Sequence, residues 1–121
     1  MKRLNIGVIC YPTVGGSGVV ATELGKKMAA RGHSVHFITS ERPFRLTQLS
    51  DNVQFHRVEI EGYSVFQYPP YDIALANRIA QVIQSEALDV LHVHYAVPPA
   101  IAATLGRHMA DSSIPIVTTL H

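Results

Sequence analysis

Residues 4–40, LNIGVICYPTVGGSGVVATELGKKMAARGHSVHFITS, combine an apolar run, a glycine cluster, a helical pattern and a second apolar run. The first run, residues 4–10, is typical of a strand that is covered on both faces. Residues 18–31 follow with helical spacing, and residues 34–40 form the second strand-like run. A strand, a helix and another strand at this spacing predict a parallel βαβ unit with a right-handed crossover.

The expected helix at 18–31 has an apolar side on which Val20, Leu24 and Met28 lie four residues apart. Gly32 comes directly after the helical pattern, at the position where a glycine commonly ends a helix.

The rest of the chain continues the same alternation of strands and helices. A helix is expected over 72–86, with Asp72 as its N-cap. Its apolar stripe consists of Leu75, Ile79, Val82 and Ile83. The other expected elements are strands at 53–60, 88–95 and 114–121 and a helix at 98–109. This order predicts the α/β class, with a Rossmann-like, doubly wound parallel sheet.

The composition is typical of one globular domain and argues against several classes of partner. Of 121 residues, 47% are hydrophobic, and ten Lys and Arg against nine Asp and Glu give a net charge of +1. Because no basic stripe stands out, nucleic acid is not expected as a partner. The apolar run near Met1 is too short for a membrane span or a signal peptide, so we expect a cytoplasmic protein that does not bind membranes. Cys10, the only cysteine, is expected to be a small buried residue.

The glycine cluster matches a cofactor-binding pattern but stands in a different position. Gly16 to Ala21 fit the dinucleotide pattern G-x-G-x-x-A, and Glu41 follows the second strand, as an acidic ribose ligand would. However, residues 11–15 separate this match from the first strand, whereas the dinucleotide turn begins directly after its strand. The wider loop offers backbone N–H groups, the Ser17 hydroxyl and a helix N-terminus, which together favour an anion. The alternative is that Ser17 only caps the helix and the glycines only shape a turn.

Polar residues also follow the last two expected strands, at the edge where open α/β sheets bind ligands. Tyr95 comes at the end of the fourth strand, and Thr118, Thr119 and His121 come at the end of the fifth. Hydroxyl and imidazole groups at this edge are suited to hydrogen-bond a polyhydroxy or carboxylate ligand.

Two of the seven histidines, His92 and His94, are expected on one face of the fourth strand, opposite to the face of Val93. No nearby Cys, Asp or Glu completes a metal site of familiar spacing, so no metal is expected. Four further histidines are expected to be surface or core residues without a chemical role, namely His33, His36, His56 and His108.

The sequence stops at the end of its last expected strand, where a complete domain usually continues into a loop and a covering helix. We therefore expect residues 1–121 to be part of a longer protein. The sheet edge left open at that strand makes self-association, as a homo-oligomer, a further expectation.

Three motifs give the chain a family resemblance: GGSG at 15–18, DVLHVHYAVP at 89–98 and VTTLH at 117–121. They resemble the N-terminal domain of retaining GT-B glycosyltransferases of family 4. With PFRL at 43–46 and YPPYD at 68–72, the chain is similar to those members that join N-acetylglucosamine to L-malate in bacillithiol biosynthesis. The resemblance extends over essentially the whole chain.

This resemblance implies transfer of N-acetylglucosamine from UDP-N-acetylglucosamine to the L-malate hydroxyl, with retained configuration and with no cofactor or essential metal. It implies that Gly16 and Ser17 lie against the donor diphosphate and the malate carboxylate, and that Tyr95 and Thr119 bind malate. His121 would be the catalytic residue, reaching the transferred sugar. The residues that grip the UDP-sugar belong to a C-terminal domain that this chain lacks, so residues 1–121 alone are expected to be inactive.

Two alternatives remain open at this point. One is a family 4 transferase with another acceptor, such as an inositol phosphate or a lipid. The other is a nucleotide-binding module of the Rossmann or flavodoxin type without catalytic activity.

Overall fold

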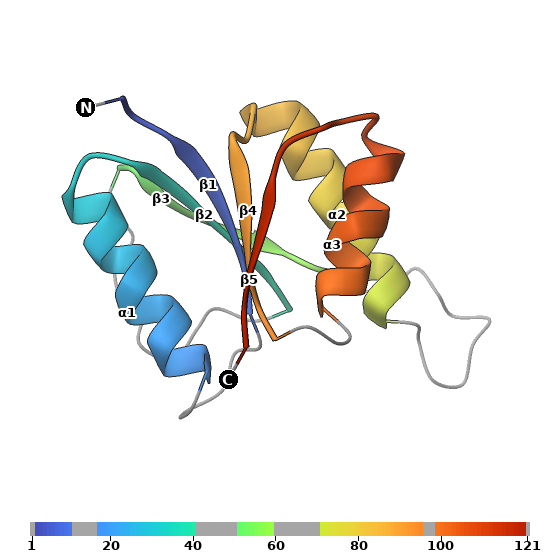
Figure 1. The fold of residues 1–121 in the computed structure, drawn as a ribbon, viewed down its shortest axis with the longest axis horizontal. Coiled ribbons are helices and arrows are strands. Elements are labelled where there is room, and N and C mark those ends of the chain that lie inside the picture. Colours follow the sequence, from blue (N-terminus) through green and yellow to red (C-terminus); the bar gives the residue numbers. More distant parts are fainter. Residues whose placement is uncertain (1, 11–16, 41–50, 60–70, 96–98, 121) are drawn as a thin grey trace.

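The computed structural model describes residues 2–10, 17–40, 51–59, 71–95 and 99–120 of the chain. Within these ranges strands and helices alternate as the sequence predicts (Figure 1). Their bounds are β1 (Asn5–Ile9), α1 (Ser17–Ala30), β2 (Ser34–Thr39), β3 (Val53–Arg57), α2 (Tyr71–Glu86), β4 (Val90–His94), α3 (Pro99–Met109) and β5 (Ile116–Thr119).

The described strands form one five-stranded sheet in the order β3-β2-β1-β4-β5. Every neighbouring pair is parallel, and β1 in the centre pairs with both β2 and β4, so that Ile6 stands opposite Val35 on one side and Val90 on the other. The chain adds β2 and β3 on one side of β1 and then returns to add β4 and β5 on the other side. The expected α/β class with a doubly wound parallel sheet is therefore confirmed, and β1 and β4 flank the switch point at which such sheets bind ligands.

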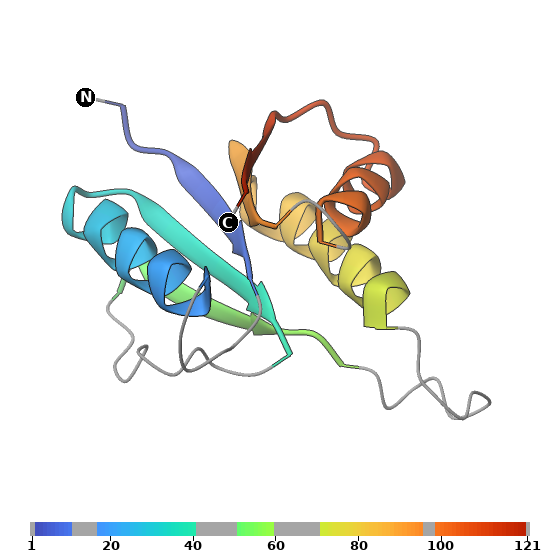
Figure 2. The same cartoon turned by 60° about the horizontal axis from the view of Figure 1, so that its bottom comes forward.

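Helices cover the two faces of the sheet unequally, with α1 on one face and α2 and α3 side by side on the other (Figures 1 and 2). The core under α2 and α3 contains Ile9, Ile38, Leu91 and Val93 from the strands. Successive strand residues point to opposite faces, so the neighbours of these residues belong to a second, smaller core under α1. That core consists of Ile6, Val8, Cys10, Ala21, Ala29, Val35, Phe37 and Val53.

The α2 stripe is confirmed, because Leu75, Ile79, Val82 and Ile83 are all buried. The expected N-cap is wrong, since α2 begins at Tyr71 and Asp72 lies inside its first turn, where a carboxylate still interacts favourably with the helix dipole.

The face of α1 that packs on the sheet is not centred on the apolar row of Val20, Leu24 and Met28, of which only Met28 packs against the core. Val20 and Leu24 are 48% and 39% exposed, whereas Ala21, Gly25 and Ala29 face the sheet. The physical reason is the size of Phe37 on β2, whose ring carries the atom nearest to a Cβ built on Gly25, only 2.5 Å away. A small helix face therefore packs against a large strand residue, and Val20 and Leu24 lie outside the core.

At the opposite edge from β3, β5 leaves part of its length exposed: Val117 is 52% exposed and Leu120, just beyond the strand, 74%. Among the described helices, none is both long and apolar enough to cross a membrane.

Candidate functional site

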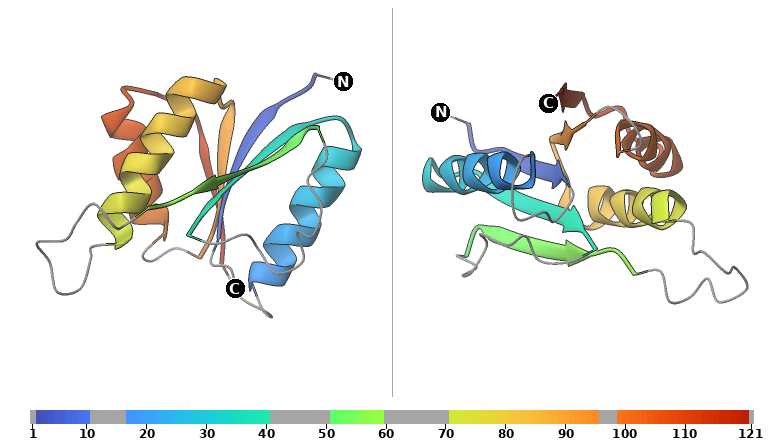
Figure 3. Two further views of the ribbon diagram at one scale, coloured as in Figure 1. Left: turned by 180° about the vertical axis from the view of Figure 1, so that it is seen from behind. Right: turned by 90° about the horizontal axis from the view of Figure 1, so that it is seen from below.

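The carboxyl ends of the strands and the N-terminal turn of α1 lie at the same end of the molecule, the lower end in Figure 1 and the end seen from below in Figure 3. Of the residues expected at this edge, Tyr95 and Thr119 are described. Ser17 is the first residue of α1, but its side chain is outside the described part, as are Gly16 and His121. The structure thus brings together two of the five expected site residues, and the roles of all five stay predictions.

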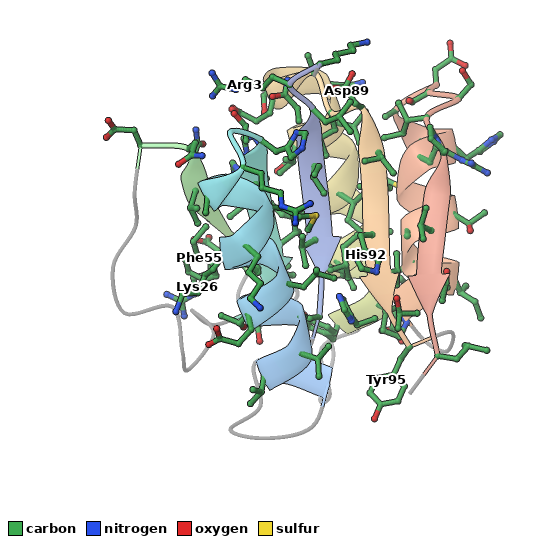
Figure 4. The ribbon with its side chains drawn as sticks, turned by 60° about the vertical axis from the view of Figure 1, so that its left-hand side comes forward. Arg3, Lys26, Phe55, Asp89, His92 and Tyr95 are labelled. Atoms are coloured by element: carbon green, nitrogen blue, oxygen red, sulfur yellow. The ribbon has the colours of Figure 1, made fainter. Side chains whose placement is uncertain are left out.

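Tyr95 lies directly beyond β4 and is half-exposed at this edge (Figure 4). Its backbone N–H donates to the carbonyl oxygen of Thr119 at 2.9 Å, which ties the ends of β4 and β5 together. Its φ of 82° is a left-handed conformation that a bulky side chain rarely adopts. Strained residues of this kind concentrate at ligand-binding sites, because the surrounding structure must hold them in place.

Thr119 makes a side-chain contact that the sequence analysis did not predict. Its Oγ1 lies 2.7 Å from Nε2 of His92, a hydrogen bond from β5 to β4. Thr118 stands opposite Val93 in the parallel register and Thr119 opposite His94, so the two threonines point to opposite faces and their hydroxyls do not act from one side.

His92 and His94 lie on one face of β4, as expected, with ring centroids 4.4 Å apart and planes tilted by 41°. His94 is only 1% exposed, and Val93 between them is buried in the core of the other face. The strand alternation in the sequence located the histidine pair. The bond to Thr119 required the register between β4 and β5.

Cys10, which is buried, and Tyr71, which is partly buried, lie near the same edge. Burial raises the pKa of the Cys10 thiol to about 12, so it stays protonated and acts as a core residue, as expected. Burial also raises the pKa of Tyr71, at the start of α2, while polar groups of Ser40 at the end of β2 act in the opposite direction. Tyr71 therefore joins α2 to the carboxyl end of β2.

Three other histidines, His33, His36 and His56, make side-chain contacts, and His108 is exposed on α3. Nδ1 of His33 accepts the backbone N–H of Leu4 at 3.0 Å. His36 and His56 stack beneath α2, with Nδ1 of His36 3.0 Å from Nε2 of His56 and 4.0 Å from the Glu86 carboxylate. Within the described ranges, no group of three or more His, Cys, Asp or Glu side chains could hold a metal ion.

A separate cleft of about 310 Å³ lies between α2 and the residues at the end of β3. Arg57 and Arg78 line it together with Glu59, so it presents charges of both signs. It lies on the α2 side of the sheet, opposite to the face that carries the bond between His92 and Thr119.

The described part of the strand-end site therefore offers a phenol, a hydroxyl, the partly buried imidazole of His92 and the N-terminus of a helix. These are hydrogen-bonding groups for an oxygen-rich ligand, and the positive end of the helix dipole favours one that carries negative charge.

A curated relative, N-acetyl-alpha-D-glucosaminyl L-malate synthase of Bacillus anthracis, is 61% identical over 119 residues. The alignment covers 98% of this chain but only 31% of the relative, so the chain spans less than a third of its length.

Solved structures share the fold at low sequence identity. A glycosyltransferase from Rickettsia africae superposes with a TM-score of 0.69 at 16% identity, over 98% of this chain and 30% of that one. The C-terminal domain of a hydrogenase from Pyrococcus furiosus superposes with a TM-score of 0.65 at 14% identity, over 99% of this chain and 94% of that one. Since proteins with such different names share it, the fold alone does not decide the function.

The sequence profile of Glycosyltransferase Family 4 matches residues 14–121, which include the glycine cluster, the strand-end residues and all elements from α1 onward. The chain therefore belongs to Glycosyltransferase Family 4.

Proposed function

We propose that this chain is the acceptor-side, N-terminal part of a retaining glycosyltransferase that transfers N-acetylglucosamine from UDP-N-acetylglucosamine to the hydroxyl of L-malate, the first step of bacillithiol biosynthesis. The observation that carries this proposal is the 61% identity over 119 residues to the Bacillus anthracis synthase. Because the chain spans 31% of that relative, the donor-binding domain is assigned to the part of the protein beyond it.

In this proposal L-malate lies at the carboxyl ends of β1, β4 and β5. Tyr95 and Thr119 hydrogen-bond the malate, and their mutual backbone bond of 2.9 Å fixes the spacing between them. Gly16 and Ser17, where the chain enters α1, bind the malate carboxylate and the donor diphosphate with the help of the helix dipole. His121, directly after Leu120, reaches the transferred sugar.

The proposed reaction is a front-face substitution. The malate hydroxyl oxygen attacks the anomeric carbon from the side on which the bond to the UDP oxygen breaks, so the configuration is retained. The departing phosphate accepts the proton of the malate hydroxyl. The protein thus supplies no carboxylate nucleophile, and its task is to hold both substrates in reacting geometry. No metal or cofactor is assigned a role, the partners are these two small molecules, and the proposed location is the cytoplasm.

Mass spectrometry of the product tests this proposal. The full-length protein that contains this chain is incubated with UDP-N-acetylglucosamine and L-malate, and the expected product is a malate glycoside of N-acetylglucosamine. Reactions without malate, and with residues 1–121 alone, serve as controls and should yield none. If the full-length protein forms UDP but no malate glycoside, the assigned acceptor is wrong.

A further inference from the structure

The bond between His92 and Thr119 determines what the Thr119 hydroxyl can offer a ligand. A threonine hydroxyl has one hydrogen to donate and two lone pairs that accept. If Nε2 of His92 carries no hydrogen, it accepts the Thr119 hydrogen across their 2.7 Å contact, and Thr119 can then only accept from a ligand. If Nε2 carries the hydrogen, it donates to Oγ1 of Thr119, and the hydroxyl hydrogen is free for a ligand.

The chemistry of the acceptor selects between these two states. An ionised carboxylate only accepts hydrogen bonds, so a threonine that binds it must donate. Hydrogen bonds to an ionised group are also stronger than bonds between neutral groups. The state with the hydrogen on Nε2 of His92 is therefore the one that fits a malate carboxylate beside Thr119.

The surroundings of His92 hold its ring in place for this role. The ring of His94 lies 4.4 Å away on the same face of β4 and is almost wholly buried, which limits the rotation of His92. On the other side of the bond, Thr119 is fixed by the β5 register opposite His94 and by the backbone bond from Tyr95. Figure 4 shows His92 on β4, set back from the end of the strand where Tyr95 lies.

We propose that His92 is a positioning residue for the acceptor: with its hydrogen on Nε2, it orients the Thr119 hydroxyl so that the hydroxyl donates to a malate carboxylate. This inference rests on the proposed function and extends it to a residue that acts through Thr119.

Steady-state kinetics of variants of the full-length protein test the inference. Replacing His92 by Leu removes the donor but keeps an apolar side chain of similar size, and we expect it to raise the malate KM about tenfold. The KM for UDP-N-acetylglucosamine should stay within about twofold, because the lost bond concerns the acceptor alone. His92→Gln should restore much of the malate affinity, since its amide nitrogen can donate from nearly the position of Nε2.

A double-mutant cycle separates positioning from a structural role. Thr119→Val removes the hydroxyl and keeps the side-chain shape. If His92 acts through that hydroxyl, adding His92→Leu to Thr119→Val should change the malate KM by no more than about twofold. The inference would be overturned if the fold-increases in malate KM of the two single variants multiplied in the double variant. It would also be overturned if His92→Leu raised the KM of both substrates equally.

A spectroscopic measurement on the unmodified protein keeps the test independent of how the variants fold. With ring-nitrogen-labelled histidine, the nitrogen NMR signals of His92, assigned by their loss in His92→Gln, should report the hydrogen on Nε2 when malate is bound. A hydrogen on Nδ1 alone contradicts the proposal. If the unmodified protein makes no malate glycoside, the proposed function fails and this inference fails with it. If the protein makes the malate glycoside normally but His92 carries its hydrogen on Nδ1, the inference about His92 fails and the proposed function stands.

Discussion

Tyr95 has a φ of 82°, a backbone conformation that favours glycine and is strained for a residue with a side chain. For a residue with a Cβ, the left-handed region costs about 1–2 kcal/mol. The strained turn places the phenol beyond β4, and the N–H of the same residue donates a hydrogen bond to the carbonyl oxygen of Thr119.

A matched pair of substitutions separates this strain from the loss of the phenol. Tyr95→Gly and Tyr95→Ala both remove the side chain, but only glycine relaxes the backbone. We expect Tyr95→Gly to be more stable than Tyr95→Ala by about 1 kcal/mol in urea unfolding, the reverse of the usual order of these residues. Both should raise the malate KM alike. An alanine variant as stable as the glycine variant would show that position 95 is not strained.

Ser17 carries the prediction at the start of α1. In the full-length protein, Ser17→Ala should raise the malate KM more than that of the sugar nucleotide, because its hydroxyl is assigned to the malate carboxylate. Loss of one hydrogen bond to a charged group corresponds to about 1.5–3 kcal/mol. Kinetics with each substrate varied in turn measure this. If Ser17→Ala raised the KM of both substrates equally, Ser17 would act only as a helix cap.

His56 gives a pH dependence of stability. Burial, together with His36 and Arg78, lowers the pKa of His56 to about 4, although Glu86 acts in the opposite direction. The unfolded chain binds this proton at about pH 6.5, so the free energy of unfolding should fall as the pH drops from 6.5 towards 4. Because His56 is only half-buried, we expect a loss of about 1–2 kcal/mol.

Urea unfolding at several pH values measures this loss, with His56→Gln as the control. The control should show a flatter profile over the same range, since it has no proton to bind at position 56. Parallel profiles for the two proteins would assign the acid sensitivity to other groups.

At this scale the sequence predicted which residues lie together at one edge but missed a contact between them. Tyr95 and Thr119 lie side by side because strand ends of a parallel sheet meet at one edge, and their roles stay predictions. The bond from His92 to Thr119 depends on the register of β4 and β5, which side-chain patterns alone do not encode. Gly16, Ser17 and His121 were assigned from motifs alone, and their roles stay predictions.

At the scale of elements, periodicity predicted where each helix and strand lies but not always which side is buried. The α2 stripe was correct because large side chains fill the space between two helices and the sheet. The buried side of α1 is not the face of Val20 and Leu24, because the fit there depends on Phe37, a residue on another element. Close packing between elements, and not hydrophobicity within one, decided the outcome.

The contact between α2 and α3 gives a prediction of this kind. A Cβ on Gly106 would lie 2.7 Å from the backbone carbonyl oxygen of Ala76, so α3 would have to move away from α2. Gly106→Ala should therefore lower the free energy of unfolding by about 1–3 kcal/mol, despite the better helix propensity of alanine. Urea unfolding measures it.

A substitution on the exposed side of the same helix provides the control. Ile101 is 62% exposed, and Ile101→Ala should change the stability by no more than about 0.5 kcal/mol. If Gly106→Ala is as mild as this control, the two helices do not pack as closely as described.

At the scale of the whole molecule, the alternation of elements was enough to predict a doubly wound parallel sheet, since connections in such sheets are short and right-handed. It did not by itself predict function, as the shared fold of a hydrogenase domain shows. The assignment of a malate acceptor rests on motifs and identity, and the edge formed by β1, β4 and β5 is where it places the ligand.

A competition between acceptors tests this assignment most directly. The full-length protein is given UDP-N-acetylglucosamine with equal concentrations of L-malate and an inositol phosphate, and both glycosides are quantified by mass spectrometry. Strand-end groups that bind a small carboxylate should give the malate glycoside as the dominant product. If the main product is the glycoside of inositol phosphate, the family assignment stands but the proposed malate acceptor is contradicted.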